Sequence, residues 1–131
     1  MDQHHLRIVT KLALLAEQNN RCVLCGKRDP NALHEWALKR GDLPKKRQEE
    51  LANLLFSEIN CVVLHNNPCH LAFGQTRWLE VEVAHYKQDQ GHDVLAHFAA
   101  IRTAIPTWTS AAWDKKSNRL VGRIHGDFQA R

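Results

Sequence analysis

The sequence predicts a single α+β domain in which helices flank a small core of strands and turns. The chain has 131 residues, the usual length of one domain. Apolar residues recur at helical spacing near both ends, whereas cysteine and histidine residues gather between Cys22 and His70. Within the domain we expect an N-terminal helix in residues 1–20, the core in residues 21–78, and a helical extension and tail in residues 79–131.

The chain is basic, with 18 lysine and arginine residues against 14 aspartate and glutamate residues and a formal net charge of +4. This balance is compatible with binding to nucleic acid, although many basic proteins of this size bind none. No run of about 18 apolar residues is present, so no membrane partner is expected. Residues 1–5 are polar and unlike a signal peptide, which predicts a cytoplasmic protein with reduced cysteines.

Residues 3–18 are predicted to form a helix with one apolar face. Asp2 is a suitable N-cap, and Asn19 and Asn20 tolerate the left-handed backbone that ends many helices. The apolar positions at helical spacing are Leu6, Val9, Leu12, Ala13 and Ala16. We therefore interpret this segment as a packing helix.

Two cysteines separated by two residues follow this helix. Cys22 and Cys25 are spaced to hold one ion between their thiolates, and Gly26 permits the backbone conformation of a tight turn. A thiol redox pair has the same spacing, but it expects a flanking βαβ pattern that the sequence lacks. The pair therefore favours a metal site.

Two short strands are predicted in the core. Residues 32–38 carry His34 and Glu35 between apolar neighbours, and residues 60–64 are rich in β-branched side chains. Titratable residues inside an apolar strand make sense where they meet a cation or a water molecule. The alternative is an exposed strand edge with a solvated glutamate.

A second pair of metal ligands follows the second strand. His65 and Cys69 are separated by a turn that contains Pro68. Together with Cys22 and Cys25 they predict a structural zinc site with three sulfur ligands and one nitrogen ligand, an ordinary set for zinc. The remaining thiol, Cys61, lies on the predicted strand, and we interpret it as a packed side chain.

Cations cluster between the two strands, at the start of a helix predicted over residues 43–56. They are Lys39, Arg40, Lys45, Lys46 and Arg47. Such a cluster either covers a solvated helix face or contacts the phosphates of DNA. Arg77, just beyond the start of the last core helix, is by the same reasoning either a phosphate ligand or a surface arginine.

The C-terminal part of the chain is predicted to be mainly helical. Helices are expected over residues 78–90 and 93–105, and Pro106 ends the second of them. Residues 113–124 contain a polar turn between two apolar segments, which is typical of a hairpin.

The order of these motifs resembles the HNH endonucleases. The segments that carry the resemblance are Cys-x2-Cys-Gly at residues 22–26, Leu-His-Glu at 33–35, Asn-x-Val-Val-Leu-His at 60–65 and Cys-His at 69–70. Together with Lys-Arg-Gly and Gly-Gln-Thr-Arg, they look especially similar to standalone HNH proteins of phages. The resemblance covers residues 21–78 and implies a ββα-metal fold, in which a β-hairpin and a helix surround one divalent cation beside a four-ligand zinc site.

Residue by residue, the resemblance implies four catalytic candidates. His34 and His70 correspond to ligands of the catalytic cation, and Glu35 stands where the general-base histidine of the family usually lies. An alternative register makes His34 the base and gives the ligand role to Glu35 or to water. Asn60 corresponds to an asparagine that braces the loop between the two strands. In the zinc site, His65 replaces the commoner cysteine.

The activity that the resemblance implies is hydrolysis of DNA phosphodiester bonds, by nicking or double-strand cleavage, in a bacterial or phage-infected cell. The cofactors would be structural Zn²⁺ and catalytic Mg²⁺, Mn²⁺ or another divalent cation. Besides DNA, a second copy of the chain is a candidate partner, because a duplex break needs two sites or two encounters; a larger phage or defence complex is another. The alternative, kept open by Glu35, is a catalytically inactive zinc-binding module that binds DNA or protein.

Overall fold

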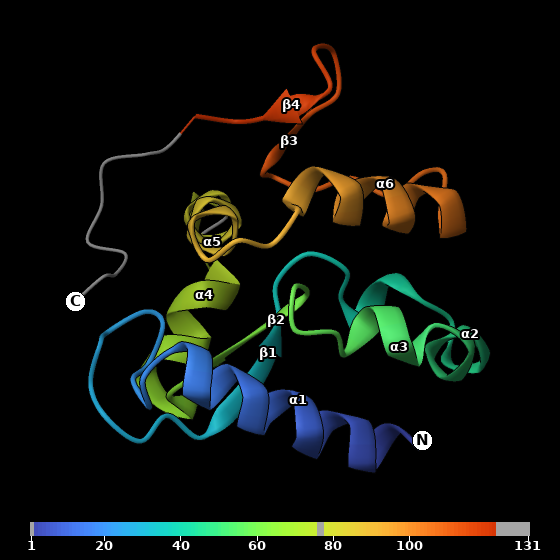
Figure 1. Cartoon of the computed structure of the whole chain (residues 1–131). Helices are drawn as coiled ribbons and strands as arrows, with labels where there is room; N and C mark the ends of the chain where they lie inside the picture. The colour runs from blue at the N-terminus through green and yellow to red at the C-terminus, as the bar shows by residue number, and fades with distance from the viewer. Residues whose placement is uncertain (1, 76–77, 123–131) are drawn as a thin grey trace.

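The computed structural model describes residues 2–75 and 78–122, and its mixture of helices and small sheets confirms the predicted α+β class (Figure 1). The strands pair antiparallel, β1 with β2 and β3 with β4. In chain order the elements are α1 (Gln3–Glu17), β1 (Ala32–Glu35), the 3₁₀ turn η1 (Arg40–Asp42), α2 (Lys45–Glu50), α3 (Ala52–Leu55), β2 (Cys61–Leu64), the π-helical turn η2 (Asn66–His70), α4 (Leu71–Gln75), α5 (Trp78–Asp89), α6 (Val94–Ala104), β3 (Trp113–Asp114) and β4 (Arg119–Leu120).

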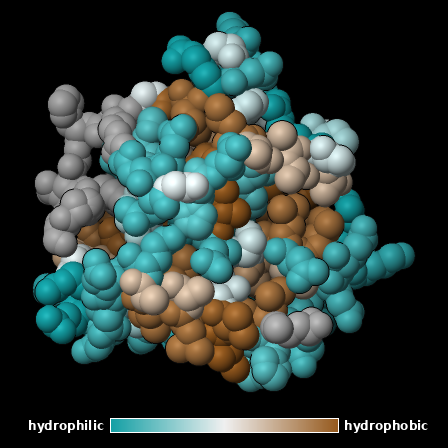
Figure 2. Space-filling model, in the orientation of Figure 1, coloured by the Kyte–Doolittle hydropathy of each residue, from teal (hydrophilic) through white to brown (hydrophobic). Residues whose placement is uncertain are grey.

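The β1–β2 pair lies at the centre of the molecule, and α1 packs against one of its faces (Figure 1). Leu14 of α1 is fully buried against Cys61 and Val63 of β2. The N-terminus of α1 is capped as predicted, because the Asp2 carboxylate accepts the backbone N–H of His5 at 2.9 Å. The rest of α1 is less buried, and apolar surface remains over it (Figure 2).

Strand alternation sends neighbouring residues of β1 to opposite faces of the pair. Leu33 packs with the α1-facing cluster, and Glu35 lies opposite Cys61 on that same face. His34 lies opposite Val62 on the other face, where its ring meets the ring of Phe73 in α4 at a centroid distance of 4.4 Å. The two titratable residues of β1 therefore face different surroundings.

The larger hydrophobic core joins the β1–β2 region to the C-terminal helices. The Phe98 ring of α6 lies 5.9 Å from the ring of Trp36, which follows β1. The same Phe98 ring lies 5.3 Å from Trp108 and 5.5 Å from Trp113. Such aromatic contacts bury large apolar area, so α6 and the β3–β4 hairpin are packed onto the core.

β1 is shorter than the predicted strand over residues 32–38, because Asn60 takes over the hydrogen bonding of the following backbone. The N–H of Trp36 donates to the Asn60 carbonyl at 3.1 Å. The N–H of Leu38 donates to the Asn60 side-chain oxygen at 2.9 Å. With its polar groups satisfied in this way, the chain turns out of the strand after Glu35.

The helix predicted over residues 43–56 is divided at Leu51, where the backbone has φ −104° and ψ 19°. None of the residues in the polar segment before the break is buried. Ala52 and Leu55, after the break, are buried in the core. The division therefore lets the apolar half turn inward while the charged half stays in solvent, a tertiary demand that overrides helical continuity.

A buried ion pair connects α5 to α1. Lys87 is fully buried, and its ammonium group donates to the Glu17 carboxylate at 3.3 Å and to the Glu58 carbonyl at 2.6 Å. Burial lowers the pKa of Lys87, and the negative charge of Glu17 opposes that effect.

Within the described ranges, no helix combines the length and the apolar character that a membrane crossing needs.

Candidate functional site

The four predicted zinc ligands converge in space. Their ligand atoms all lie within 4.8 Å of one another. Cys22 and Cys25 come from the loop after α1, whereas His65 and Cys69 come from the turn after β2. Three sulfur ligands and one imidazole nitrogen are a donor set that suits tetrahedral zinc, so this cluster (the Cys3His cluster) could hold such an ion.

The loop that carries the first two cysteines has the geometry of a metal knuckle. Gly26 adopts a φ of +76°, which favours glycine, and its N–H donates to the Cys22 carbonyl at 2.9 Å. The backbone N–H groups of Leu24 and Cys25 both donate to the Cys22 sulfur at 3.4 Å. The turn therefore directs backbone donors at a sulfur that is ready to carry negative charge.

His65 is oriented for metal binding by its second nitrogen. Its Nε2 lies 2.9 Å from the Arg28 carbonyl, to which only a protonated nitrogen can donate. In the tautomer that carries its proton on Nε2, Nδ1 is free to bind a metal, and this atom lies 3.3 Å from the Cys25 sulfur. A carbonyl that fixes the tautomer in this way is a usual partner of metal-binding histidines.

The thiols of the Cys3His cluster have divergent proton affinities. Burial would raise the pKa of Cys22, but hydrogen bonds donated by the backbone of Cys25, His65 and Leu24 lower it to about 7. Burial and the neighbouring thiols raise the pKa of Cys69 to about 12. Close thiols without a countercharge cannot all ionise, and a divalent cation would remove that conflict.

A second site lies next to the Cys3His cluster and contains His34 and His70. Their ring centroids are 4.9 Å apart, with the planes inclined at 73°. The His34 Nε2 atom is buried and has no hydrogen-bond partner. Burial, reinforced by the positive charges of His70, Lys39 and Arg40, lowers the pKa of His34 to about 4. The neutral ring thus presents an unsatisfied buried nitrogen, which suits a metal ligand.

Glu35 and His34 lie on opposite faces of β1. Its buried carboxylate accepts from the Arg40 guanidinium Nε at 3.0 Å and lies 3.4 Å from the Arg40 backbone nitrogen. Both Glu35 and His34 nevertheless line one cavity of about 240 Å³, together with Arg40 and His70. The edge of β1 therefore brings the two residues to a common space from opposite sides.

Asn60 braces the loop between the two strands. Its fully buried amide nitrogen donates to the carbonyls of Leu38 at 2.7 Å and Leu55 at 2.8 Å. Its oxygen lies 2.8 Å from Nε2 of His97 in α6. Sequence reasoning missed His97. The available signal was a histidine at helical spacing from Val94, Phe98 and Ile101, which are the apolar positions of α6.

We expect His97→Gln to destabilise the protein more at about pH 7.5 than at about pH 5.5. Burial, together with the charges of Lys87 and His92, lowers the pKa of His97 to about 4. The unfolded chain has an ordinary pKa of about 6.5, so it binds the proton first as the pH falls, and the wild type loses stability between these values.

The variant lacks this titration, so the difference from wild type should shrink by about 1.4 kcal/mol between the two pH values. Urea denaturation followed by circular dichroism measures it. A difference independent of pH would contradict a neutral His97 in the folded protein.

The predicted cation cluster is more strongly paired than its composition suggested. The carboxylate partners are Glu80 for Lys39, Glu35 for Arg40 and Glu50 for Arg47. Arg47 also donates to the Ala104 carbonyl at 3.2 Å, which gives it a structural role between α2 and α6. Lys45 and Lys46 are exposed, and Arg77 lies outside the described residues. Contact of these cations with DNA stays a prediction.

Comparison of the chain with protein-family models, with curated proteins and with solved structures finds no match. A function for the chain is therefore inferred from the geometry of the two adjoining sites.

Proposed function

We propose that the chain is a metal-dependent endonuclease of the HNH type that hydrolyses phosphodiester bonds in DNA. The observation that carries this proposal is the pairing of His34 and His70, with ring centroids 4.9 Å apart, directly beside the Cys3His cluster. Few purely structural roles leave a buried imidazole nitrogen without a partner, as is found for His34.

The order of the elements supports the proposal. β1 carries His34, β2 pairs antiparallel with it, and His70 comes at the end of η2, directly before α4. A ββα-metal fold requires the same order, two strands and then a helix. Asn60 supports it as well, because its hydrogen bonds hold the loop that leaves β1.

In the proposed reaction, His34 and His70 would hold a divalent cation through imidazole nitrogens. Such a cation would act as a Lewis acid at the scissile phosphate. Between the two registers open from the sequence, the contacts favour His34 as the ligand, since the Glu35 carboxylate is already engaged by Arg40.

Glu35 then has the role of proton acceptor. A water oxygen bonds to phosphorus, its proton passes to the Glu35 carboxylate, the bond between phosphorus and the 3′ oxygen breaks, and solvent protonates that oxygen. Arg40 lies close enough to hold the carboxylate in place at 3.0 Å. An ordinary carboxylate, with a pKa of about 4.3, is a weaker base than imidazole, so we expect a slow enzyme.

Plasmid cleavage tests the proposal. Wild-type protein with Mg²⁺ or Mn²⁺ should convert supercoiled DNA into nicked or linear forms, and His34→Ala combined with His70→Ala should abolish that conversion. His5→Ala is the matched control, because His5 is an exposed histidine that does not line the cavity beside His34 and His70. Zinc content and circular dichroism establish that the variants fold. Undiminished cleavage by the double variant would contradict the assignment of His34 and His70 to the catalytic site.

A second candidate function is a zinc-binding module without catalysis, and one observation favours it. The Glu35–Arg40 ion pair occupies the carboxylate that catalysis would need. Such a module would retain DNA binding but show no cleavage with Mg²⁺, Mn²⁺, Ni²⁺ or Zn²⁺. The plasmid experiment therefore separates the two candidates when DNA binding is measured on the same preparation.

A further inference from the structure

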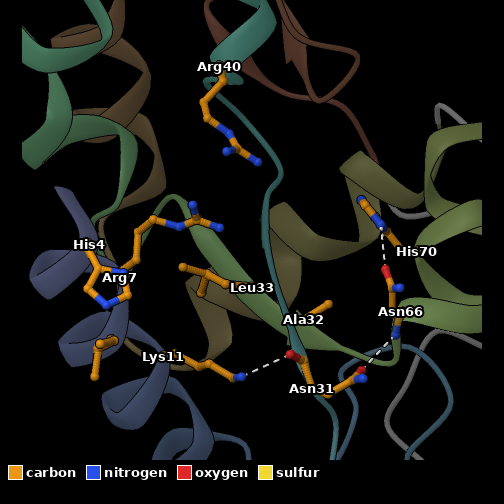
Figure 3. A pocket seen from close by; sticks show the side chains of 10 residues that line it. His4, Arg7, Lys11, Asn31, Ala32, Leu33, Arg40, Asn66 and His70 are labelled. Atoms are coloured by element: carbon orange, nitrogen blue, oxygen red, sulfur yellow. Dashed lines mark hydrogen bonds between the residues drawn. The ribbon is translucent and has the colours of Figure 1, made fainter.

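A groove between α1 and β1 carries a set of cations that the predicted DNA-binding residues, Arg40 apart, did not include. It encloses about 460 Å³, a volume within the range of small-ligand sites. His4, Arg7 and Lys11 line it from α1, one helical turn apart, and Arg40 and His70 line it from the core (Figure 3). None of the described residues that line this groove is acidic.

The groove adjoins the cavity beside His34 and Glu35. Leu33, Arg40 and His70 line both spaces. A strand whose phosphate lies at His70 must leave that point in two directions, and the groove along α1 is open to one of them. The opening is therefore placed for the nucleotide next to the reacting phosphate.

The α1 cations are held in position without being neutralised. The Arg7 guanidinium lies 5.4 Å from the centre of the Phe56 ring, a cation–π contact that orients it and leaves its charge intact. The Lys11 ammonium donates to the Asn31 carbonyl at 2.9 Å. Among the described carboxylates, none forms an ion pair with either residue. Fixed and uncompensated cations of this kind suit a polyanion.

We propose that this groove binds the phosphodiester backbone of a DNA strand adjacent to the reacting phosphate, with Arg7 and Lys11 each neutralising one phosphate. The inference rests on the proposed function for the position of the reacting phosphate. Charge complementarity selects the occupant, and the exposed Ile8 side chain on the groove wall provides apolar surface for a sugar or base.

The salt dependence of DNA binding tests this proposal. Binding of a fluorescent duplex is measured by anisotropy at several salt concentrations, without added divalent cation, for wild type and for Arg7→Gln combined with Lys11→Gln. Each lost phosphate contact should lower the slope of log K against log salt by about 0.9, so the double variant should lose about 1.8. At 0.1 M salt its affinity should fall on the order of 10- to 100-fold.

Two further variants serve as controls. Lys115→Gln with Lys116→Gln removes the same charge from the exposed turn between β3 and β4, at the end of the molecule away from α1 (Figure 1). It should leave the slope unchanged. Arg7→Lys keeps the charge but loses the guanidinium on Phe56, so it should retain the slope even if stability falls.

If the Arg7 and Lys11 double variant loses no more slope than the Lys115 and Lys116 control, DNA does not bind in the groove. If wild type still cleaves plasmid in that case, only the groove proposal is refuted and the nuclease proposal stands. Conversely, if the slope falls as expected but the protein cleaves no DNA with any divalent metal, the groove is a DNA-binding site and the nuclease proposal is refuted. If wild type binds no DNA, the groove proposal is refuted.

Discussion

Removal of metal by a chelator is expected to unfold the core. A zinc ion in the Cys3His cluster would tie the loop after α1 to the turn after β2, and regular secondary structure between α1 and β1 is limited to an isolated bridge between Arg21 and Arg28. Binding of structural zinc contributes about 10–16 kcal/mol in small zinc peptides. That is comparable to the whole folding free energy of a domain, about 5–15 kcal/mol. Thermal unfolding by circular dichroism, with and without EDTA, measures the loss.

Cysteine variants separate metal binding from packing. Cys69→Ser should lose the zinc and the cooperative unfolding transition. Cys61→Ala is the matched control: Cys61 is fully buried, belongs to no metal cluster, and its pKa is raised chiefly by burial. It should keep one zinc per chain and lose the packing of one sulfur atom together with the weak hydrogen bond from its thiol to the Leu55 carbonyl at 3.4 Å. A Cys69→Ser protein with one tightly bound zinc and an unchanged melting temperature would refute a structural metal at this cluster.

Asn60→Asp is expected to be the most damaging single change in the loop between the strands. The amide nitrogen of Asn60 donates to the Leu38 and Leu55 carbonyls, and aspartate has no donor at that position. The Leu38 carbonyl would lose its Asn60 donor at a cost of about 1–3 kcal/mol, and the Leu55 carbonyl would keep only the Cys61 thiol at 3.4 Å. A buried carboxylate adds to this cost. Urea denaturation near neutral pH should show this loss as a lower midpoint.

Asn53→Asp supplies the matched control for that experiment. Asn53 is an exposed residue of α3, so the same chemical change there should alter the free energy of unfolding by less than about 0.5 kcal/mol. Equal midpoints for the two variants would show that the side-chain bonds of Asn60 contribute nothing. Because His97 bonds to the oxygen of Asn60, the pH dependence of the free energy of unfolding that His97 causes should also change in Asn60→Asp.

The two halves of the Cys3His cluster and the outline of the fold could be predicted because their determinants are local. A Cys-x2-Cys-Gly turn brings two thiols together by itself. A run of β-branched residues predicts a strand, and a capping residue before an apolar periodic segment predicts the start of a helix. The structure contains both predicted strands, the first of them shortened to Ala32–Glu35, and pairs them antiparallel with Glu35 opposite Cys61. The buried state of Cys61 likewise agrees with its interpretation as a packed thiol.

What could not be predicted depends on residues far apart in the chain. The break at Leu51 follows from the core that Ala52 and Leu55 must reach. His97 acquires its role only because α6 packs over Asn60. The local sequence does not single out Arg7 and Lys11, and only the placement of α1 beside β1 brings them to one groove with His70.

The five-residue turn η2 contributes a residue to each of the two candidate metal sites. Cys69 belongs to the Cys3His cluster and His70, the next residue, faces His34, while the His70 N–H donates to the His65 carbonyl at 3.0 Å. An ion that orders this turn from one side lowers the entropy lost when a second ion binds on the other. In the proposed enzyme the two affinities are therefore expected to be positively cooperative, and the enhancement is the same in both directions.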